Sequence, residues 1–357
     1  MKILRIYLKL TIKDIARYKT NLVESKLFLK LIKFLKYLMP FNSYKDKLII
    51  TIILCCLLLS NAWSADLDFQ DCDSKNSYVV FEEKNRNILL EKNADERIYP
   101  ASLVKLMTLY LAFEAIENKK INLNRAIKIS KRAEEVSRVN KVNTLHLHEH
   151  QSISVREAIL AIIVRSFNEA AIALAEAVAN DEWQFVRLMN KKAQELGMYN
   201  TSFRNASGLH EVSQYTTAKD LARLAVAIKT DFPDYYHLFS LKTFKFNKQK
   251  YKTHNHILEE YRGAEGLKTG FTNASGFNLI ASALKGKVRV ISVLIGCPSA
   301  SKREAFTKKL LNRAFEKIPH QVYPEISGKI IKNFSFEMSD YYTPRLSDED
   351  IKRSKLN

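Results

Sequence analysis

The stretch from Pro100 to Phe113 constrains the fold of this chain more than any other feature, because it is apolar almost throughout. Pro100 suits the first turn of a helix, and the leucine, valine, methionine and aromatic residues that follow leave almost no polar face. A helix that is apolar all round belongs in the interior of a domain. We therefore expect a buried helix here, with the rest of the chain packed around it.

Two polar residues interrupt the start of this helix, Ser102 and Lys105. Residues three apart share one face of a helix, and a lysine in an apolar setting loses solvation, which disfavours its charged form. A neutral amine can take the proton of a neighbouring hydroxyl and leave a nucleophile, and N–H groups at a helix start can hold an oxyanion. By itself, however, the pattern is more typical of a helix-start serine and a lysine that reaches solvent.

The same S-x-x-K spacing occurs twice more, at Ser282/Lys285 and at Ser299/Lys302. The first pair lies in a predicted strand, where residues three apart point to opposite faces. The second pair lies in a loop with no apolar helix behind it. Neither pair is predicted to be catalytic.

Two later elements favour the catalytic interpretation of the first pair. Ser166-Phe167-Asn168 follows an apolar segment and precedes an alanine-rich helix, and Lys268-Thr269-Gly270 lies in a strand-like stretch. The elements S-x-x-K, S-x-N and K-T-G in this order form the signature of penicillin-binding proteins and class A β-lactamases.

From about residue 76 to residue 318 the sequence resembles a low-molecular-mass penicillin-binding protein, a serine-type D-alanyl-D-alanine carboxypeptidase of peptidase family S11. Residues 205–209, 215–222 and 273–279 also resemble stretches of that family. The resemblance implies an α/β (α+β) fold, with a five-stranded antiparallel sheet, helices on both of its faces and a helical subdomain. The order of predicted elements agrees, with strands near both ends of this region and helices between them; a strand is also predicted over 239–246.

The resemblance also implies roles for particular residues. Ser102 would be the nucleophile, Lys105 its general base and Ser166 the relay of the proton to the leaving amine. The substrate would be bound by Asn168, Lys268, Thr269, Gly270, Phe271 and Arg303. Phe167 departs from the small residue common in carboxypeptidases, which puts the substrate preference in doubt. The alternative interpretation of Arg303 is a surface arginine at a helix start.

The partners implied are peptidoglycan stem peptides as substrates and β-lactam antibiotics as covalent inhibitors, with no metal or cofactor. A β-lactamase, a peptidoglycan endopeptidase and a wall-binding module without turnover are alternatives on the same fold. No family-like glutamate loop stands between Ser166 and Lys268, which argues against the β-lactamase. The intact Ser102, Lys105, Ser166 and Lys268 argue against the binding module.

Alternating histidines make a metal site conceivable, although no cysteine or carboxylate framework accompanies them. We expect loop or strand-face positions instead for His146, His148, His150, His254 and His256.

The N-terminal part predicts export. Leu48 to Leu59 is an apolar run too short for a comfortable membrane span, and small residues follow it, as in a signal peptide. We expect a signal peptide over 39–64, cut after Ala62 or Ser64, and a basic upstream extension over 1–38 that is not translated if synthesis starts at Met39. A basic amphipathic helix is the alternative for that extension.

We expect a catalytic domain over 66–318. After it we expect a tail over 319–357 without a second β-rich domain. Because the tail has no apolar face suited to an interfacial helix, we expect a protein of the periplasm or cell envelope with at most loose electrostatic contact to a membrane.

Charge and cysteines add two points. The net charge of +19 is compatible with nucleic acid, but no zinc-finger, helix-turn-helix or RNA-binding signature is present, so we expect no nucleic-acid partner. The basic surface could instead attract anionic wall polymers or lipid head groups.

After signal removal only Cys72 and Cys297 remain. In the family fold their strands are neighbours, so the two could pair, and the pairing stays open at this point.

Overall fold

The computed structural model describes residue 72, residues 75–139 and residues 144–318. The segments predicted as upstream extension, signal peptide and C-terminal tail lie outside these residues. No helix within the described ranges is both long enough and apolar enough to cross a membrane.

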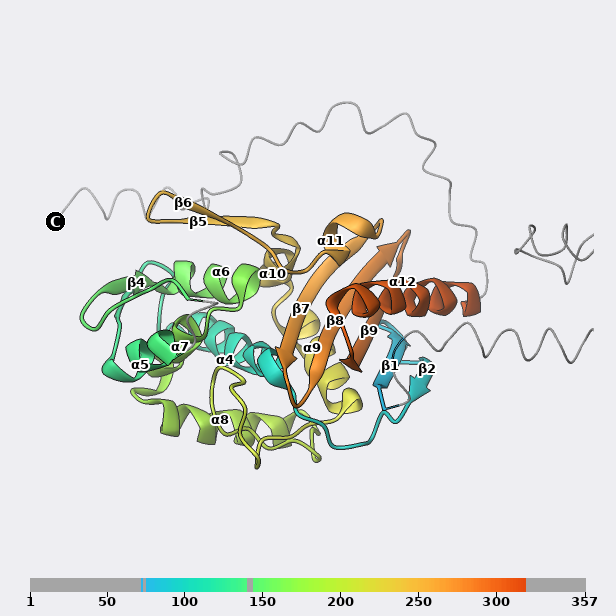
Figure 1. Cartoon of the computed structure of the whole chain (residues 1–357), viewed down its shortest axis with the longest axis horizontal. Coiled ribbons are helices and arrows are strands. Elements are labelled where there is room, and N and C mark those ends of the chain that lie inside the picture. Colours follow the sequence, from blue (N-terminus) through green and yellow to red (C-terminus); the bar gives the residue numbers. More distant parts are fainter. Residues whose placement is uncertain (1–71, 73–74, 140–143, 319–357) are drawn as a thin grey trace, which may run out of the picture. The chain divides into compact units, whose positions relative to one another are not determined.

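A five-stranded antiparallel sheet forms one half of the fold, as predicted, with the strand order β2-β1-β9-β8-β7 (Figure 1). It joins distant parts of the chain: β1 (Ser77–Glu82), β2 (Ile88–Lys92), β7 (Ala264–Thr272), β8 (Gly276–Lys285) and β9 (Val288–Cys297). Because β1 pairs with β9, the start of the domain is hydrogen-bonded to its last strand, while β7 forms one edge of the sheet.

Helices cover both faces of the sheet. Along β9, Ile291, Val293 and Ile295 belong to the main core, against which α9 (Ala218–Asp231) packs. The alternate residues Val290 and Leu294 are also buried and stand outside that core. The last helix, α12 (Ala300–Lys317), packs on β8 and β9, as Figure 1 shows. A strand buried on both faces is apolar at most positions, and β9 fits this, with Arg289 and Ser292 among its apolar residues.

The helical half surrounds α4 (Lys105–Glu117), in which ten of the thirteen residues are buried. Helix α4 packs on α7 (Asn168–Ala179), α8 (Glu182–Glu195) and α9, while α5 (Lys131–Val139) and α6 (Val155–Arg165) pack on α7. The sequence encodes several of their starts: Ser154 and Glu157 form a capping box on α6, and the Asp181 side chain caps α8. The predicted buried helix is therefore the centre of this half.

The remaining elements are short. They are the 3-10 turns η1 (Ala101–Val104) and η2 (His237–Ser240), the strands β3 (Ala126–Lys128), β4 (Ser152–Ser154), β5 (Thr243–Phe246) and β6 (Gln249–Lys252), and the helices α10 (Pro233–Tyr236) and α11 (Ile257–Glu260).

The strand predicted over 239–246 was wrong in its first half, and the structure confirms it only over Thr243–Phe246. Residues up to Ser240 form η2, and β5 pairs only with β6, in a separate hairpin. Phe239 is buried against Phe113 and Tyr236, with ring centroids 6.4 and 6.0 Å apart. Burial in this aromatic cluster overrides the strand propensity of the segment.

Cys72 and Cys297 form a disulfide, with their Cα atoms 5.1 Å apart. The pairing that the sequence left open is thus made. It links the start of the domain to the end of β9, directly before α12, and the Cys72 sulfur also lies 3.7 Å from the Lys302 carbonyl oxygen in the first turn of that helix.

Candidate active site

Ser102 lies in η1, and Lys105 begins α4 directly after it, so the two side chains meet on one face. The Lys105 Nζ atom lies 3.0 Å from the Ser102 Oγ atom and 2.7 Å from the Asn168 Oδ1 atom. It also donates to the carbonyl oxygen of Ser207. Lys105 is fully buried, so the amine is held among these acceptors and away from solvent.

Burial changes the protonation of two lysines at this site. The pKa of Lys105 lies well below its ordinary value, mainly because burial penalises the charged form and secondarily because Lys268 repels it; Glu169 acts in the opposite direction. Burial, with help from the charge of Arg303, lowers the pKa of Lys268 to about 7. Ionisable groups perturbed in this way are typical of catalytic sites.

A cavity of about 800 Å³ opens above these lysines. All of the predicted site residues except Lys105 and Lys268 line it: Ser102, Ser166, Asn168, Thr269, Gly270, Phe271 and Arg303. The two lysines lie beneath its surface. The structure therefore brings together side chains that are up to about two hundred positions apart in the sequence.

Ser166 reaches the cavity because α6 ends on it. Its backbone is in the left-handed region, with φ 64°, and its N–H donates to the Ile162 carbonyl oxygen at 3.0 Å. The chain then turns, and Asn168 begins α7. A non-glycine residue in this conformation at a helix end costs energy, and such residues cluster at functional sites.

Phe167, between these two residues, does not line the cavity. It is buried, and its ring packs edge-on against Tyr251 and Phe244 at centroid distances of 5.4 and 6.3 Å. The aromatic side chain at this motif position therefore supports the β5–β6 hairpin from inside.

The edge strand β7 runs close to the serine turn, and this explains the glycine of K-T-G. A Cβ atom on Gly270 would lie 3.3 Å from the Ser102 backbone nitrogen and 3.4 Å from the Ala101 Cβ atom. Since β7 is an edge strand, it presents unpaired backbone groups on that side. The backbone of β7 and that of η1 thus approach each other at the cavity.

The Asn205–Leu209 loop, for which the sequence predicted no role, lies against Lys105, because its Ser207 carbonyl oxygen accepts from the Lys105 amine. Within the loop, Asn205 Nδ2 donates to the Leu209 carbonyl oxygen at 3.0 Å. The φ of Gly208 is +80°, and a Cβ atom there would lie 2.0 Å from the Ala101 carbonyl oxygen. The only signal in the sequence was the family-like stretch at 205–209.

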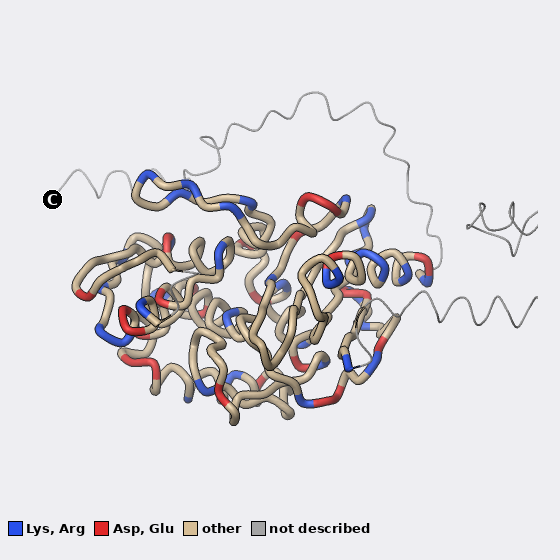
Figure 2. Tube along the Cα trace, viewed as in Figure 1, with Lys and Arg blue, Asp and Glu red and all other residues tan. Residues whose placement is uncertain are grey.

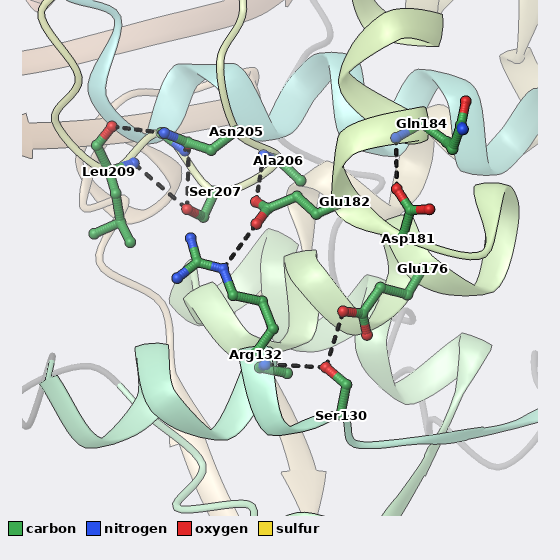
Figure 3. Close-up of polar contacts among 12 residues, drawn as sticks. Ser130, Arg132, Glu176, Asp181, Glu182, Gln184, Asn205, Ala206, Ser207 and Leu209 are labelled. Carbon is green, nitrogen blue, oxygen red and sulfur yellow. Dashed lines mark hydrogen bonds and ion pairs between the residues drawn. The ribbon is translucent and has the colours of Figure 1, made fainter.

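Side chains of the helical half hold this loop in place, as Figure 3 shows. Glu182 at the start of α8 accepts from the Ala206 N–H at 3.0 Å and pairs with Arg132 of α5 at 3.0 Å. Nearby, Ser130 donates to Glu176 at 2.8 Å. The position of the Ser207 carbonyl therefore depends on α5 and α8 as well as on the loop itself.

Arg303 is not the exposed surface residue of the alternative interpretation. It is buried, pairs with Glu304 through its Nε atom at 3.2 Å, and donates to the Asn278 carbonyl oxygen at 3.5 Å. It reaches the cavity from α12, so a positive charge stands on the sheet side of the site.

The histidines separate into two groups. His254 and His256 line the cavity, and burial, with the charge of Arg165, lowers the pKa of His254 to about 4. His148 instead contacts Glu134 at 3.3 Å. Within the described ranges, no group of three His, Cys, Asp or Glu side chains is arranged to hold a metal ion.

The two other S-x-x-K pairs have ordinary structural roles. The Ser299 side chain caps α12 by accepting from the Lys302 N–H at 3.2 Å. Ser282 lies in β8 and donates to Glu265 at 3.0 Å. Only the first pair combines the buried lysine with the cavity.

Comparisons with known proteins identify the family of the chain. The family described as D-alanyl-D-alanine carboxypeptidase (Peptidase_S11) matches residues 65–299. The chain is 35% identical over 242 residues to D-alanyl-D-alanine carboxypeptidase DacC of Escherichia coli K12, which covers 67% of the chain and 60% of DacC. The chain thus spans less than two thirds of that relative.

Solved structures show the same fold. Penicillin-binding protein 5 of Haemophilus influenzae superposes with a TM-score of 0.65 at 36% identity, covering 67% of this chain and 70% of that one. Penicillin-binding protein D2 of Listeria monocytogenes, solved with ampicillin bound, gives a TM-score of 0.61 at 30% identity, covering 69% and 97%. From the family match over most of its length, the chain belongs to the D-alanyl-D-alanine carboxypeptidases of peptidase family S11.

Proposed function

We propose that this protein is a penicillin-sensitive serine D-alanyl-D-alanine carboxypeptidase that removes the terminal D-Ala from peptidoglycan stem peptides. The observation that carries the proposal is the fully buried Lys105 amine, with its lowered pKa, 3.0 Å from the Ser102 hydroxyl. Because burial disfavours the charged form of this amine, it can accept the serine proton as a general base. The resemblance of the chain to a protein solved with ampicillin bound supports β-lactams as covalent ligands of Ser102.

The first half of the reaction would proceed as follows. Ser102 Oγ attacks the carbonyl carbon of the D-Ala–D-Ala bond while its proton passes to Lys105. The oxyanion forms between the N–H groups of Ser102 and Phe271, and preorganised donors of this kind are worth a large part of the rate enhancement. The close approach of Gly270 to the Ser102 nitrogen supports this arrangement.

The carbon–nitrogen bond then breaks, and the leaving amine takes a proton relayed through Ser166. This leaves an ester on Ser102 and a free D-Ala. Water hydrolyses the ester, restores the serine and gives the shortened peptide a new terminal carboxylate. Asn168 would bind the substrate amide, and Thr269 and Arg303 would bind the terminal carboxylate of the substrate. Lys268 would supply positive charge from beneath the cavity.

Covalent labelling tests this proposal. Ser102→Ala should abolish labelling by a fluorescent penicillin, because acylation needs that oxygen. Ser299→Ala removes the serine of another S-x-x-K pair and should leave labelling intact. Full labelling of the Ser102→Ala variant would refute the assignment.

Two further measurements separate the alternatives on this fold. Release of D-Ala from a pentapeptide with a long-lived penicillin adduct indicates a carboxypeptidase, whereas rapid loss of the adduct indicates a β-lactamase. Cleavage of cross-linked stem peptides would indicate an endopeptidase, and no turnover of any substrate would indicate a binding module.

A further inference from the structure

The β5–β6 hairpin carries a concentrated positive charge. Its strands and flanks hold five exposed lysines, and no aspartate or glutamate occurs between Asp234 and Glu259. Figure 2 shows these basic residues along the hairpin. The lysines, called here the hairpin lysines, are Lys242, Lys245, Lys248, Lys250 and Lys252.

In the described ranges, no acidic side chain forms an ion pair with a hairpin lysine. Lys245 stands directly opposite Lys250 in the strand register, and like charges opposite each other destabilise a strand pair. Asn247 and Lys248 both have positive φ, 46° and 65°, as in a type I′ turn, which puts Lys248 at the tip. The arrangement therefore favours an external anion.

The hairpin is fixed at the rim of the catalytic cavity. Its inner face buries Phe244 and Phe246, and Phe167 of the S-x-N motif packs against it. Arg165, which lines the cavity, donates to the Lys252 carbonyl oxygen at 3.3 Å. Directly after β6 the chain reaches His254, which also lines the cavity. The positive strip thus leads into the active site.

We propose that the hairpin lysines bind the carboxylates of neighbouring stem peptides when a peptidoglycan polymer places one stem in the cavity. This inference rests on the proposed function. Every uncross-linked stem peptide ends in one carboxylate both before and after cleavage, so the polymer presents repeated negative charges. A surface of opposite charge beside the site raises the local concentration and the association rate of such a substrate. The hairpin lysines lie beside the catalytic cavity, so a polymer with one stem in the cavity can reach them with its neighbouring stems. This favours the polymeric substrate over a lipid surface.

Charge removal on the hairpin tests this proposal. The variant Lys245→Gln/Lys248→Gln/Lys250→Gln is compared with Lys128→Gln/Lys131→Gln/Lys287→Gln, which removes three exposed lysines elsewhere and changes the net charge equally. The rate of D-Ala release is measured on isolated peptidoglycan and on a short acetylated peptide ending in D-Ala–D-Ala. For the hairpin variant at low salt, the ratio of the polymer rate to the peptide rate should fall by about five- to tenfold.

The control variant should keep the ratio of the unaltered enzyme, and about 0.5 M salt should remove the difference between variants, because exposed charges are screened. An unchanged ratio in the hairpin variant would overturn the proposal and leave the lysines as guards against edge-to-edge strand pairing. An unchanged ratio with lost binding to phosphatidylglycerol vesicles would assign the surface to membranes.

Binding without turnover separates this inference from the proposed function. In the Ser102→Ala background, the hairpin variant should sediment less with insoluble peptidoglycan than the control variant does. If the unaltered protein releases no D-Ala from either substrate, the proposed function fails, and hairpin-dependent sedimentation would still support the docking surface. Equal sedimentation of the two variants would refute it.

Discussion

At the scale of single residues, the proposed chemistry depends on two buried lysines. Lys105 and Lys268 are both buried, and each has a pKa below its ordinary value because burial disfavours the charge. The proposed mechanism needs different states of the two: a neutral Lys105 to accept a proton, and a charged Lys268 to attract the substrate carboxylate. Arg303, which remains charged in proteins, adds to the attraction and lowers the pKa of Lys268.

Replacement of Lys105 by arginine tests its role as a base. Lys105→Arg should reduce penicillin acylation nearly as much as Lys105→Ala, because arginine keeps a charge but cannot give up its proton in a protein. The second-order rate of acylation is the measurement. Near-normal acylation of the arginine variant would mean that Lys105 acts only through its charge and that the base lies elsewhere.

The pH dependence of acylation tests Lys268. Because its pKa is about 7 in the folded protein, raising the pH through 7 removes its charge, and kcat/KM for anionic substrates should fall over that range. Deprotonation of Lys105, whose pKa burial lowers, should favour acylation as the pH rises. In Lys268→Arg the charge persists, so the alkaline limb should disappear; an unchanged alkaline limb would assign it to another group.

At the scale of elements, the site depends on where η1, β7 and α12 meet. The Gly270 position lets β7 approach the serine turn, and α12 brings Arg303 to the same cavity. The disulfide joins the start of the domain to the end of β9, immediately before α12. A cross-link over 225 residues restricts the unfolded chain strongly.

Loss of this disulfide should destabilise the domain. We expect Cys72→Ser/Cys297→Ser to lower the free energy of unfolding by about 2–4 kcal/mol, which corresponds to a Tm lower by about 5–15 °C for a domain of this size. Calorimetry with and without reductant measures it. Reductant should lower the Tm of the unaltered protein and leave that of the double variant unchanged; a reductant-insensitive Tm in both would contradict the prediction.

At the scale of the whole molecule, the proposal includes export. Disulfides persist in oxidising compartments, so the Cys72–Cys297 bond supports an exported protein. The proposed wall substrate also lies outside the cytoplasm. The signal peptide expected over 39–64 is compatible with both points and lies outside the described residues.

The mature N-terminus tests this proposal. Protein purified from cells and analysed by mass spectrometry should begin at Trp63 or Ala65, because cleavage after Ala62 or Ser64 leaves small residues at the recognised positions. The unprocessed precursor should begin at Met39. A peptide from residues 1–38 in that precursor would show that translation starts upstream.

The sequence by itself determined the central helix, the three motifs and the family. Local patterns carry these features, since an apolar run is buried wherever the chain folds, and caps such as Ser154 with Glu157 act within a few residues. The sheet also followed from the resemblance, as did seven of the residues that line the cavity.

Only the tertiary structure decided the contacts between distant segments. The Ser207 carbonyl on Lys105, the burial of Arg303 and the disulfide join residues far apart in the chain, and no local pattern encodes such pairs. The same holds for Phe167, whose ring turns from the cavity to the hairpin, and for Phe239, whose burial replaced a strand by a turn. Packing among distant side chains, rather than local propensity, sets these positions.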